Sequence, residues 1–383
     1  MGRRVRRFTL VLLWILAVLS LPLLHAQGDE GLITELKLFS KAIGAIWEAY
    51  PGNLKPRELL YQAVKGMLGS LDKYSEFIDP QRYQLLQISM RGEYAGIGAI
   101  LKMVGPQVAI SDVEPGKPGE KAGLLANDII LKIDGISMEK KTIPDVAALL
   151  RGDANTPVVV TVLREPSHQI LDIKIQRQKI EIQAIQNAHR IGKSLAYMRI
   201  AAWQENTTDQ ADKTLKDLKK KGMKALIIDL RNNDGGLMTQ AVSLAERFLP
   251  KGKKIVSVQS KIEEQRKDYF SSYEKGSTQL PLVILVNQKT ASASEVFSGA
   301  LQDHRRATIV GVQTFGKGSV QSIIPLDGVS GMKLTTARYV TPTEKVIDGA
   351  GLTPDRVVEN GPVGTPGEDR QLLEATSILK RYT

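Results

Sequence analysis

Two short, almost continuously apolar runs constrain the fold of this chain most strongly. They occupy residues 224–230 and 282–286, and the second reads Leu-Val-Ile-Leu-Val. Strands without polar alternation are typical of a sheet that is covered by helices on both faces. Stretches with helical periodicity surround the two runs, at residues 206–221, 237–249 and 294–302. We therefore predict that residues 180–360 form an α/β domain with a mixed sheet and flanking helices.

The preceding region, residues 91–179, has a different texture, with short strands, turns and one short helix expected at residues 144–150. It opens on Gly92-Glu-Tyr-Ala-Gly-Ile-Gly98, in which glycines alternate with other residues. Such a segment exposes successive backbone N–H groups that can hold a terminal carboxylate, here those of Gly96, Ile97 and Gly98. The region is therefore predicted to be a compact β-rich module that binds peptide tails.

Both ends of the chain are expected to lie outside these two domains. Residues 1–26 have a basic head, an apolar stretch and a small residue at the end, which is the pattern of a secretory signal peptide. An uncleaved apolar stretch of this length would instead anchor the chain in a membrane. Either way the protein is predicted to be exported, to the periplasm or another extracytoplasmic space. Residues 27–90 are predicted to form an N-terminal helical arm, and residues 361–383 a linker followed by a C-terminal helix.

Composition excludes several kinds of chemistry. The sequence contains no cysteine, so it offers no thiol nucleophile, thiolate metal site or disulfide. The net charge of +11 becomes +7 when the four arginines of residues 1–26 are subtracted. The lysines that remain are scattered and not interleaved with aromatic residues, which argues against nucleic-acid binding. No cluster of carboxylates or histidines indicates a metal site, and no organic cofactor is implied.

Two segments of the α/β domain carry residues suited to catalysis. Ser292 lies between a predicted strand and a predicted helix, where its hydroxyl can project from the sheet edge and helix amides favour developing negative charge. Lys317 lies between two glycines, and Gln321 would share its face if the segment is a strand. A lysine acts as a general base only when burial lowers its pKa, and a neutral amide can orient it. These residues form a candidate nucleophile, base and orienter.

Other interpretations of the same residues are open. Ser292-Ala-Ser-Glu295 also matches a helix capping box, and Lys317 could occupy a surface turn. A Ser-His-Asp site lacks the Gly-x-Ser-x-Gly motif and would have to use His168, His189 or His304. Ser70-Leu-Asp-Lys73 matches Ser-x-x-Lys, but it lies in the helical arm without the accompanying motifs and is interpreted as packing.

Six segments, in this order, resemble the carboxy-terminal processing peptidase family. They are Asp229-Leu-Arg-Asn-Asn-Asp-Gly-Gly236, Pro281-Leu-Val-Ile-Leu-Val-Asn287, Ala291-Ser-Ala-Ser-Glu295, Gly299-Ala-Leu-Gln-Asp303, Thr314-Phe-Gly-Lys-Gly-Ser-Val-Gln321 and Thr341-Pro-Thr343. The resemblance covers residues 40–360 and implies a peptidase core with an inserted PDZ domain. It implies a nucleophile, a base, a supporting amide and two oxyanion-hole amides at Ser292, Lys317, Gln321, Gly236 and Ala293 respectively.

The resemblance also implies a function. A serine peptidase of this kind would hold the C-terminal tails of protein substrates in its PDZ domain and cleave near the C-terminus through an acyl-enzyme. Arg151, at the end of the helix that would line the groove, is a candidate link between the PDZ domain and the active site. The family further points to a homodimer, and it implies neither a metal nor a cofactor.

One departure from the family pattern concerns the oxyanion hole. The family has Asn-Pro-Gly-Gly where this chain has Asn233-Asp234-Gly235-Gly236, and an inward-pointing Asp234 would weaken the hole. Asp303, eleven residues after Ser292, either shares its helix face or lies on the surface at the helix end. A catalytically silent tail-binding scaffold or chaperone on the same fold is the alternative function, which Asp234 favours and the joint presence of the three candidate catalytic residues disfavours.

Overall fold

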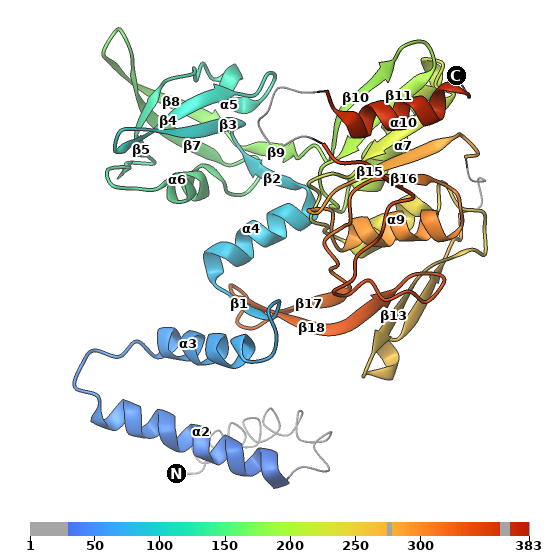
Figure 1. Ribbon diagram of the computed structural model, residues 1–383. Helices are drawn as coiled ribbons and strands as arrows, with labels where there is room; N and C mark the ends of the chain where they lie inside the picture. The colour runs from blue at the N-terminus through green and yellow to red at the C-terminus, as the bar shows by residue number, and fades with distance from the viewer. Residues whose placement is uncertain (1–29, 274–277, 361–367, 383) are drawn as a thin grey trace, which may run out of the picture. The chain divides into compact units, whose positions relative to one another are not determined.

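The structure, a computed structural model, describes residues 30–273, 278–360 and 368–382 (Figure 1). The predicted signal peptide and the linker at 361–367 therefore lie outside the described residues. The chain divides into two compact units, residues 1–67 and 68–383.

The first unit contains helix α2 (Glu30–Ala49) and most of helix α3 (Pro56–Gly69). Its apolar residues recur at helical spacing, but many remain in contact with solvent, among them Leu32, Leu36, Leu38 and Trp47. No helix in the described part of the chain is both long enough and apolar enough to cross a membrane.

A six-stranded mixed sheet lies at the centre of the second unit. Its strands follow the order β10 (Ile185–Ile191), β11 (Leu195–Ile200), β12 (Ala225–Asp229), β15 (Leu282–Val286), β16 (Thr308–Gly311) and β19 (Arg356–Val357). β10 runs antiparallel to β11, and all other neighbours are parallel. The two apolar runs of the sequence are thus the adjacent central strands β12 and β15, which confirms the predicted α/β core.

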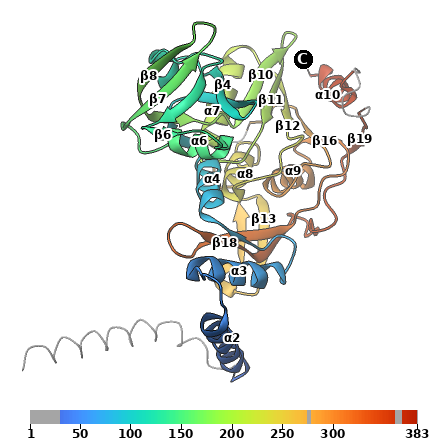
Figure 2. The same cartoon turned by 90° about the vertical axis from the view of Figure 1, so that its left-hand side faces the viewer.

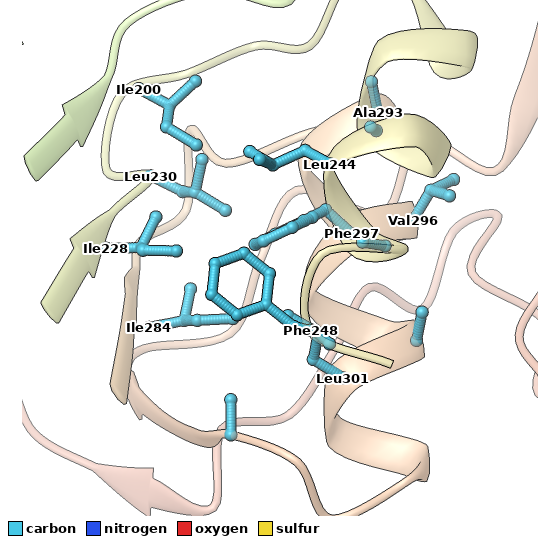
Figure 3. Packing of buried hydrophobic residues seen from close by; sticks show 14 of the residues in the cluster. Ile200, Ile228, Leu230, Leu244, Phe248, Ile284, Ala293, Val296, Phe297 and Leu301 are labelled. Carbon is cyan, nitrogen blue, oxygen red and sulfur yellow. The ribbon is translucent and has the colours of Figure 1, made fainter. Parts of the chain in front are cut away.

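Helices cover both faces of this sheet, and the strands supply apolar side chains to each. Ile228 and Ile284 belong to the core cluster on one face, which includes residues of α7 (Thr207–Lys220), α8 (Met238–Ala245) and α9 (Ala293–Asp303). Ile227 and Val283 belong to the cluster on the other face, with residues of α10 (Arg370–Lys380). Figure 3 shows Phe248 and Phe297 packed against the sheet side chains of the first face, with their rings edge to face at 6.1 Å. This packing fixes the start of α9, where Ser292 lies.

A second sheet carries the segment after Lys317. Its strand order is β1 (Glu76–Ile78), β18 (Gly331–Val340), β13 (Lys254–Ser260) and β14 (Lys267–Phe270), and β17 (Ser319–Pro325) also pairs with β18. A 3₁₀ turn, Glu263–Gln265, connects β13 and β14. β1 belongs to the region predicted as a helical arm, so that prediction omitted a strand.

The β-rich module is built on a sheet of β3 (Ala99–Val104), β4 (Gln107–Val113), β5 (Ile129–Ile133), β7 (Pro157–Arg164) and β8 (Gln169–Gln176), with β6 (Ile136–Ser137) beside β5 (Figure 2). Helices α5 (Pro118–Lys121) and α6 (Ile143–Leu150) pack on it. The chain arrives from α4 (Pro80–Arg91) through β2 (Glu93–Gly96) and leaves through β9 (Gln178–Glu181), and β2 and β9 pair antiparallel. Paired entry and exit strands are what an inserted domain requires.

Candidate active site

The strand-to-helix turn between β15 and α9 holds Ser292 in a strained backbone conformation. Its φ is +56°, unusual for a residue with a side chain, and only 7% of its surface is exposed. The Glu295 N–H donates to the Ser292 carbonyl oxygen at 2.8 Å. The turn therefore presents the serine at the N-terminal end of the helix, where backbone amides point toward its side chain.

The glycine loop after β12 packs directly on this turn. A Cβ at Gly235 would lie 2.8 Å from the Ser292 Cβ and 3.3 Å from the Ala293 nitrogen, and one at Gly236 would lie 2.2 Å from the Trp203 carbonyl oxygen. Both glycines have positive φ, +111° and +137°. Only glycine satisfies these two requirements together.

The two amides predicted to form the oxyanion hole are free to donate. In the described part of the chain, neither the Gly236 N–H nor the Ala293 N–H forms a hydrogen bond with another protein group. The neighbouring amides are occupied, since Gly235 N–H donates to Asn233 Oδ1 at 2.9 Å and Leu237 N–H to the Trp203 carbonyl at 2.8 Å. Two unpaired donors beside a candidate nucleophile are suited to binding an oxyanion.

Glu295 joins the serine turn to the lysine loop, and it is completely buried. Its Oε2 accepts the Ser292 N–H at 2.9 Å and the Lys317 N–H at 2.8 Å. Its Oε1 accepts the Gly316 N–H at 2.8 Å and the Thr314 hydroxyl at 2.5 Å. The capping-box interpretation of Glu295 is therefore correct for its bond to Ser292, but the same carboxylate also holds the loop of the candidate base.

Lys317 is partly buried, and burial lowers the pKa of its ammonium below the ordinary lysine value. The like charge of Lys333 lowers it further, while Asp234, Glu76 and Glu295 act in the opposite direction. A lysine whose neutral form is favoured in this way can accept a proton from a hydroxyl.

The Lys317 ammonium is not bonded to Ser292 in this structure. It lies over the ring of Tyr74, 5.3 Å from the ring centroid. Tyr74 belongs to the turn that precedes β1. The backbone of the lysine loop is fixed next to the serine through Glu295, whereas the Lys317 side chain points to the Tyr74 ring.

The Gln321 amide is not hydrogen-bonded to the Lys317 ammonium in the described part of the chain. Lys317 precedes β17 rather than lying in it, and the β17–β18 pairing shifts register between Val320 and Gln321, so the assumption of one shared strand face is wrong. The Gln321 Nε2 instead donates to the Ser319 hydroxyl at 2.8 Å and to Thr335 Oγ1 at 3.4 Å.

Tyr339, which sequence reasoning did not assign, lies at the site. The phenol of Tyr339 is buried, which raises its pKa to about 12, and a hydrogen bond with the Ser292 side chain partly offsets that effect. The Tyr339 N–H donates to the Gly318 carbonyl at 2.6 Å, next to Lys317. Asp234, whose place in the oxyanion hole was in question, is exposed, and its charge raises the pKa of Lys317.

The Ser-His-Asp alternative does not fit the geometry. His304 Nε2 bonds to the Lys254 carbonyl at 2.7 Å, His189 Nδ1 to the Asn187 carbonyl at 2.7 Å, and His168 Nδ1 lies 3.2 Å from Glu165. None of these three described histidines contacts Ser292. Within the described ranges, no group of three or more histidine and carboxylate side chains is placed to hold a metal.

Asp303 has a structural role at the end of α9. Its Oδ2 accepts the Thr343 N–H at 3.0 Å and hydroxyl at 2.7 Å, and its Oδ1 accepts from Lys345 at 2.9 Å. It anchors residues 341–345 instead of facing the serine.

In Ser70-Leu-Asp-Lys73, the Lys73 ammonium lies over the Tyr74 ring at 4.9 Å.

The segment that leads from β12 into the glycine loop is anchored by Arg231. Its guanidinium bonds to Asp229 at 2.6 Å and to both carboxylate oxygens of Asp369 at 2.8 Å, and the Asp229 carboxylate also accepts the Tyr197 hydroxyl at 2.8 Å. Burial lowers the pKa of Arg231, but the hydrogen bonds to the two carboxylates and their negative charges together raise it above the ordinary value. The network ties the N-terminal end of α10 to the core sheet.

The β-rich module contains a groove between β3 and α6. Its cavity has a volume of about 190 Å³, and it is lined by Leu101, Ile143, Ala147 and Leu150 together with the Gly96-Ile97-Gly98 turn. β3 lies at the edge of its sheet, so an extended peptide can pair with it. Among the described residues, the N–H groups of Ile97 and Gly98 find no protein acceptor.

Arg151 closes one end of this groove. Its guanidinium lies over the Tyr94 ring, 5.5 Å from the ring centroid. The backbone N–H of Arg151 donates to the Ala147 carbonyl at 3.1 Å. Tyr94 belongs to β2, through which the chain enters the module.

Comparison with known proteins finds a family match for the α/β core and another for the β-rich module. Residues 194–358 match the model of peptidase family S41, and residues 110–164 match a PDZ domain. The carboxy-terminal-processing protease of Bartonella bacilliformis is 38% identical over 337 residues, which cover 87% of this chain and 77% of that protein. The carboxyl-terminal-processing protease of a Picosynechococcus species is 37% identical over 81% of this chain and 76% of its own.

A solved structure of the photosystem II D1 C-terminal processing protease is 31% identical, covers 87% of this chain and 89% of its own, and gives a TM-score of 0.48. The two sequence relatives establish the family. The chain belongs to peptidase family S41 and carries a PDZ domain. It is a serine-type peptidase, and its family includes relatives named carboxy-terminal-processing proteases.

Proposed function

We propose that the protein is an endopeptidase that captures C-terminal tails of protein substrates and cleaves near the C-terminus by a Ser-Lys mechanism. The observation that carries the proposal is the Glu295 carboxylate, whose Oε2 binds the backbone N–H of both Ser292 and Lys317. A scaffold that only binds tails would not need these two loops to be held together.

The proposed chemistry begins with Lys317 as the neutral amine. It accepts the hydroxyl proton of Ser292, and the Ser292 oxygen attacks the substrate carbonyl carbon. The Gly236 and Ala293 N–H groups donate to the oxygen that becomes negatively charged. The Lys317 ammonium then gives its proton to the departing amine, which leaves an ester between the substrate acyl group and Ser292. Water, deprotonated by the neutral amine, hydrolyses this acyl-enzyme.

Gln321 has a role in this scheme only after a rearrangement. Its amide is held by Ser319 and Thr335 in the present arrangement, and the Lys317 ammonium is held by Tyr74. A side-chain movement of Lys317 toward Ser292 is therefore part of the proposal.

The PDZ groove supplies the proposed tail selectivity. The free N–H groups of Ile97 and Gly98 are suited to a terminal carboxylate, and the cavity lined by Leu101, Ala147 and Leu150 is suited to an apolar last side chain. Arg151 is proposed to connect an occupied groove to the peptidase core, because its partner Tyr94 lies on the strand that enters the module.

Export and self-association belong to the same proposal. The apolar segment within residues 1–26 is proposed to direct the chain out of the cytoplasm, with membrane contact only if it stays uncleaved. The exposed apolar side chains of α2 support a homodimer.

The test is a trimming assay with the purified protein and a substrate protein that ends in an apolar tail. We expect the wild type to shorten the tail, while Ser292→Ala and Lys317→Ala bind it without cutting. Ala147→Trp, which fills the groove, should raise KM for the tailed substrate at least about tenfold and spare the cleavage of a short untailed peptide. If the wild type, Ser292→Ala and Lys317→Ala all bind the tail and none of them cuts it, even with excess peptide, the scaffold function would be favoured.

A further inference from the structure

The turn before β1 contacts the candidate base, although sequence analysis assigned its Ser70-Leu-Asp-Lys73 stretch to packing. The ring of Tyr74 lies under the Lys317 ammonium at 5.3 Å, within the range of a cation–π interaction. Tyr74 itself is half-buried, and the strand it introduces pairs with β18, with Glu76 opposite Lys333.

The carboxylate of Asp72 holds the backbone of the turn that carries Tyr74. Asp72 Oδ1 accepts the N–H groups of Tyr74 at 2.7 Å and Ser75 at 2.9 Å, and it also accepts the Thr335 hydroxyl at 3.2 Å. Thr335 in turn accepts from the Gln321 amide at 3.4 Å. One carboxylate therefore holds both the backbone of Tyr74 and the hydroxyl of Thr335, which is a hydrogen-bond partner of Gln321.

We propose that Tyr74 is a positioning residue of the peptidase: its ring holds the Lys317 ammonium in the resting enzyme and releases the neutral amine toward Ser292. The proposal rests on the function proposed for Ser292 and Lys317. Its physical basis is that the negative face of an aromatic ring attracts a cation and not a neutral amine. When Lys317 loses its proton to solvent, the attraction that keeps it over the ring is lost, and the amine can reach the serine hydroxyl.

Other charged groups also face Lys317 and act whether or not the ring is present. They come from the neighbouring elements: Glu76 on β1, Lys333 on β18, Asp234 in the glycine loop and Glu295 on α9. The Lys73 ammonium lies over the same Tyr74 ring, at 4.9 Å from its centroid, so two cations share this ring. Burial and Lys333 favour the neutral amine, whereas the three carboxylates and the ring favour the ammonium. A test must therefore change the ring's electrostatics without changing its shape or the charges around it.

Such a test replaces Tyr74 with phenylalanine and with phenylalanines that carry one, three and five ring fluorines. Fluorination weakens the negative face while the ring's volume is nearly preserved. We expect the pH at which kcat/KM reaches half its maximum to fall stepwise with fluorination, by about 0.4 to 1.5 units in total, while Tyr74→Phe keeps the wild-type profile. Tyr74→Leu should shift the profile in the same direction.

A matched control is Tyr273→Leu, which removes the ring under Arg247, at 4.2 Å, and should leave the profile unchanged. An unchanged pH midpoint across the fluorinated series would overturn the proposal, and so would a uniform loss of kcat at every pH without a shift. Lys317→Ala distinguishes a failure of the proposed Ser-Lys mechanism from a failure of the role proposed for Tyr74. If it retains activity, the proposed mechanism fails. If it is inactive and fluorination has no effect, only the role of Tyr74 fails.

Discussion

Glu295 accepts the backbone N–H of Lys317 at 2.8 Å with the same carboxylate oxygen that accepts the N–H of Ser292. The nucleophile and the base come from segments 25 residues apart in sequence, and this oxygen sets the spacing between their backbones. The carboxylate has no exposed surface, so each of its four hydrogen bonds forms in a medium where a lost bond is costly.

We predict that Glu295→Gln damages both activity and stability. The amide nitrogen would face N–H or O–H donors where a carboxylate oxygen now accepts, which leaves buried donors without a partner. We expect a loss of about 2 to 4 kcal/mol in the free energy of unfolding and at least a 100-fold drop in kcat/KM. Urea unfolding and steady-state kinetics measure the two effects. Glu246→Gln, which changes a more exposed acceptor of Ser272, is the control and should be nearly neutral. Wild-type kinetics for Glu295→Gln would show that the bridge is not needed.

Gly235→Ala should inactivate the enzyme, because its methyl group would lie 2.8 Å from the Ser292 Cβ at a φ of +111°. We expect kcat/KM to fall at least about 100-fold, since a displacement of 1 Å at a reacting group is sufficient for such a loss. Gly252→Ala is matched to it, with a φ of +84° but no atom near the added carbon. That control should lose stability and keep activity. Equal activity of the two variants would contradict the contact between the glycine loop and the serine.

Asp234→Asn should move the pH profile of kcat/KM to lower pH. The carboxylate raises the pKa of Lys317, so its removal lowers that pKa and makes the neutral amine available at lower pH. Because Asp234 is exposed, we expect a shift of only about 0.2 to 0.7 units, and about 1 M salt should abolish the difference from wild type. The exposed Asp217, changed to Asn, serves as the control. A shift to higher pH would contradict the assignment of Lys317 as the base.

Arg231→Ala should destabilise the peptidase core. The change leaves the buried Asp229 and the partly buried Asp369 without their cation, and we expect a loss of about 3 to 5 kcal/mol near neutral pH. Burial raises the pKa of Asp369, but the hydrogen bonds from Arg231, Leu372 and Asn360 and the charge of Arg231 together lower it to below the ordinary value. The contribution of this carboxylate is therefore present above its unfolded-state pKa and is lost as the pH falls through the folded-state pKa. Denaturant unfolding should show the wild type and the variant converging at acid pH, and a constant difference would argue against the ion pair.

The core fold could be predicted from sequence because its central strands are apolar on both faces, which local pattern reveals. The second sheet could not be predicted in this way, because its strand β1 has only three residues. In β1, Glu76 pairs with Lys333 of β18, which lies 257 positions away in the sequence. Such a pairing has no signature near either residue.

The same distinction applies to the site. Local sequence is sufficient to mark Ser292 and Lys317 as candidates, but it does not indicate the bridge through Glu295, because a capping box already explains that residue locally. The expected contact of Gln321 with Lys317 assumed an uninterrupted strand, and the register shift after Val320 breaks the period of two. Tyr339 reaches the site from β18 and Tyr74 from the turn before β1, and both positions depend on tertiary pairing, so no local motif marks them.

The most direct measurement is the rate at which a fluorophosphonate probe labels the protein, followed across pH, with the modified residue identified by peptide mass spectrometry. The probe reacts only with an activated serine. We predict a single label on Ser292, a rate that rises as Lys317 loses its proton, and labelling at least about 100-fold slower in Lys317→Ala. A label on another serine, or a Lys317→Ala variant that is labelled at the wild-type rate, would contradict the Ser-Lys mechanism.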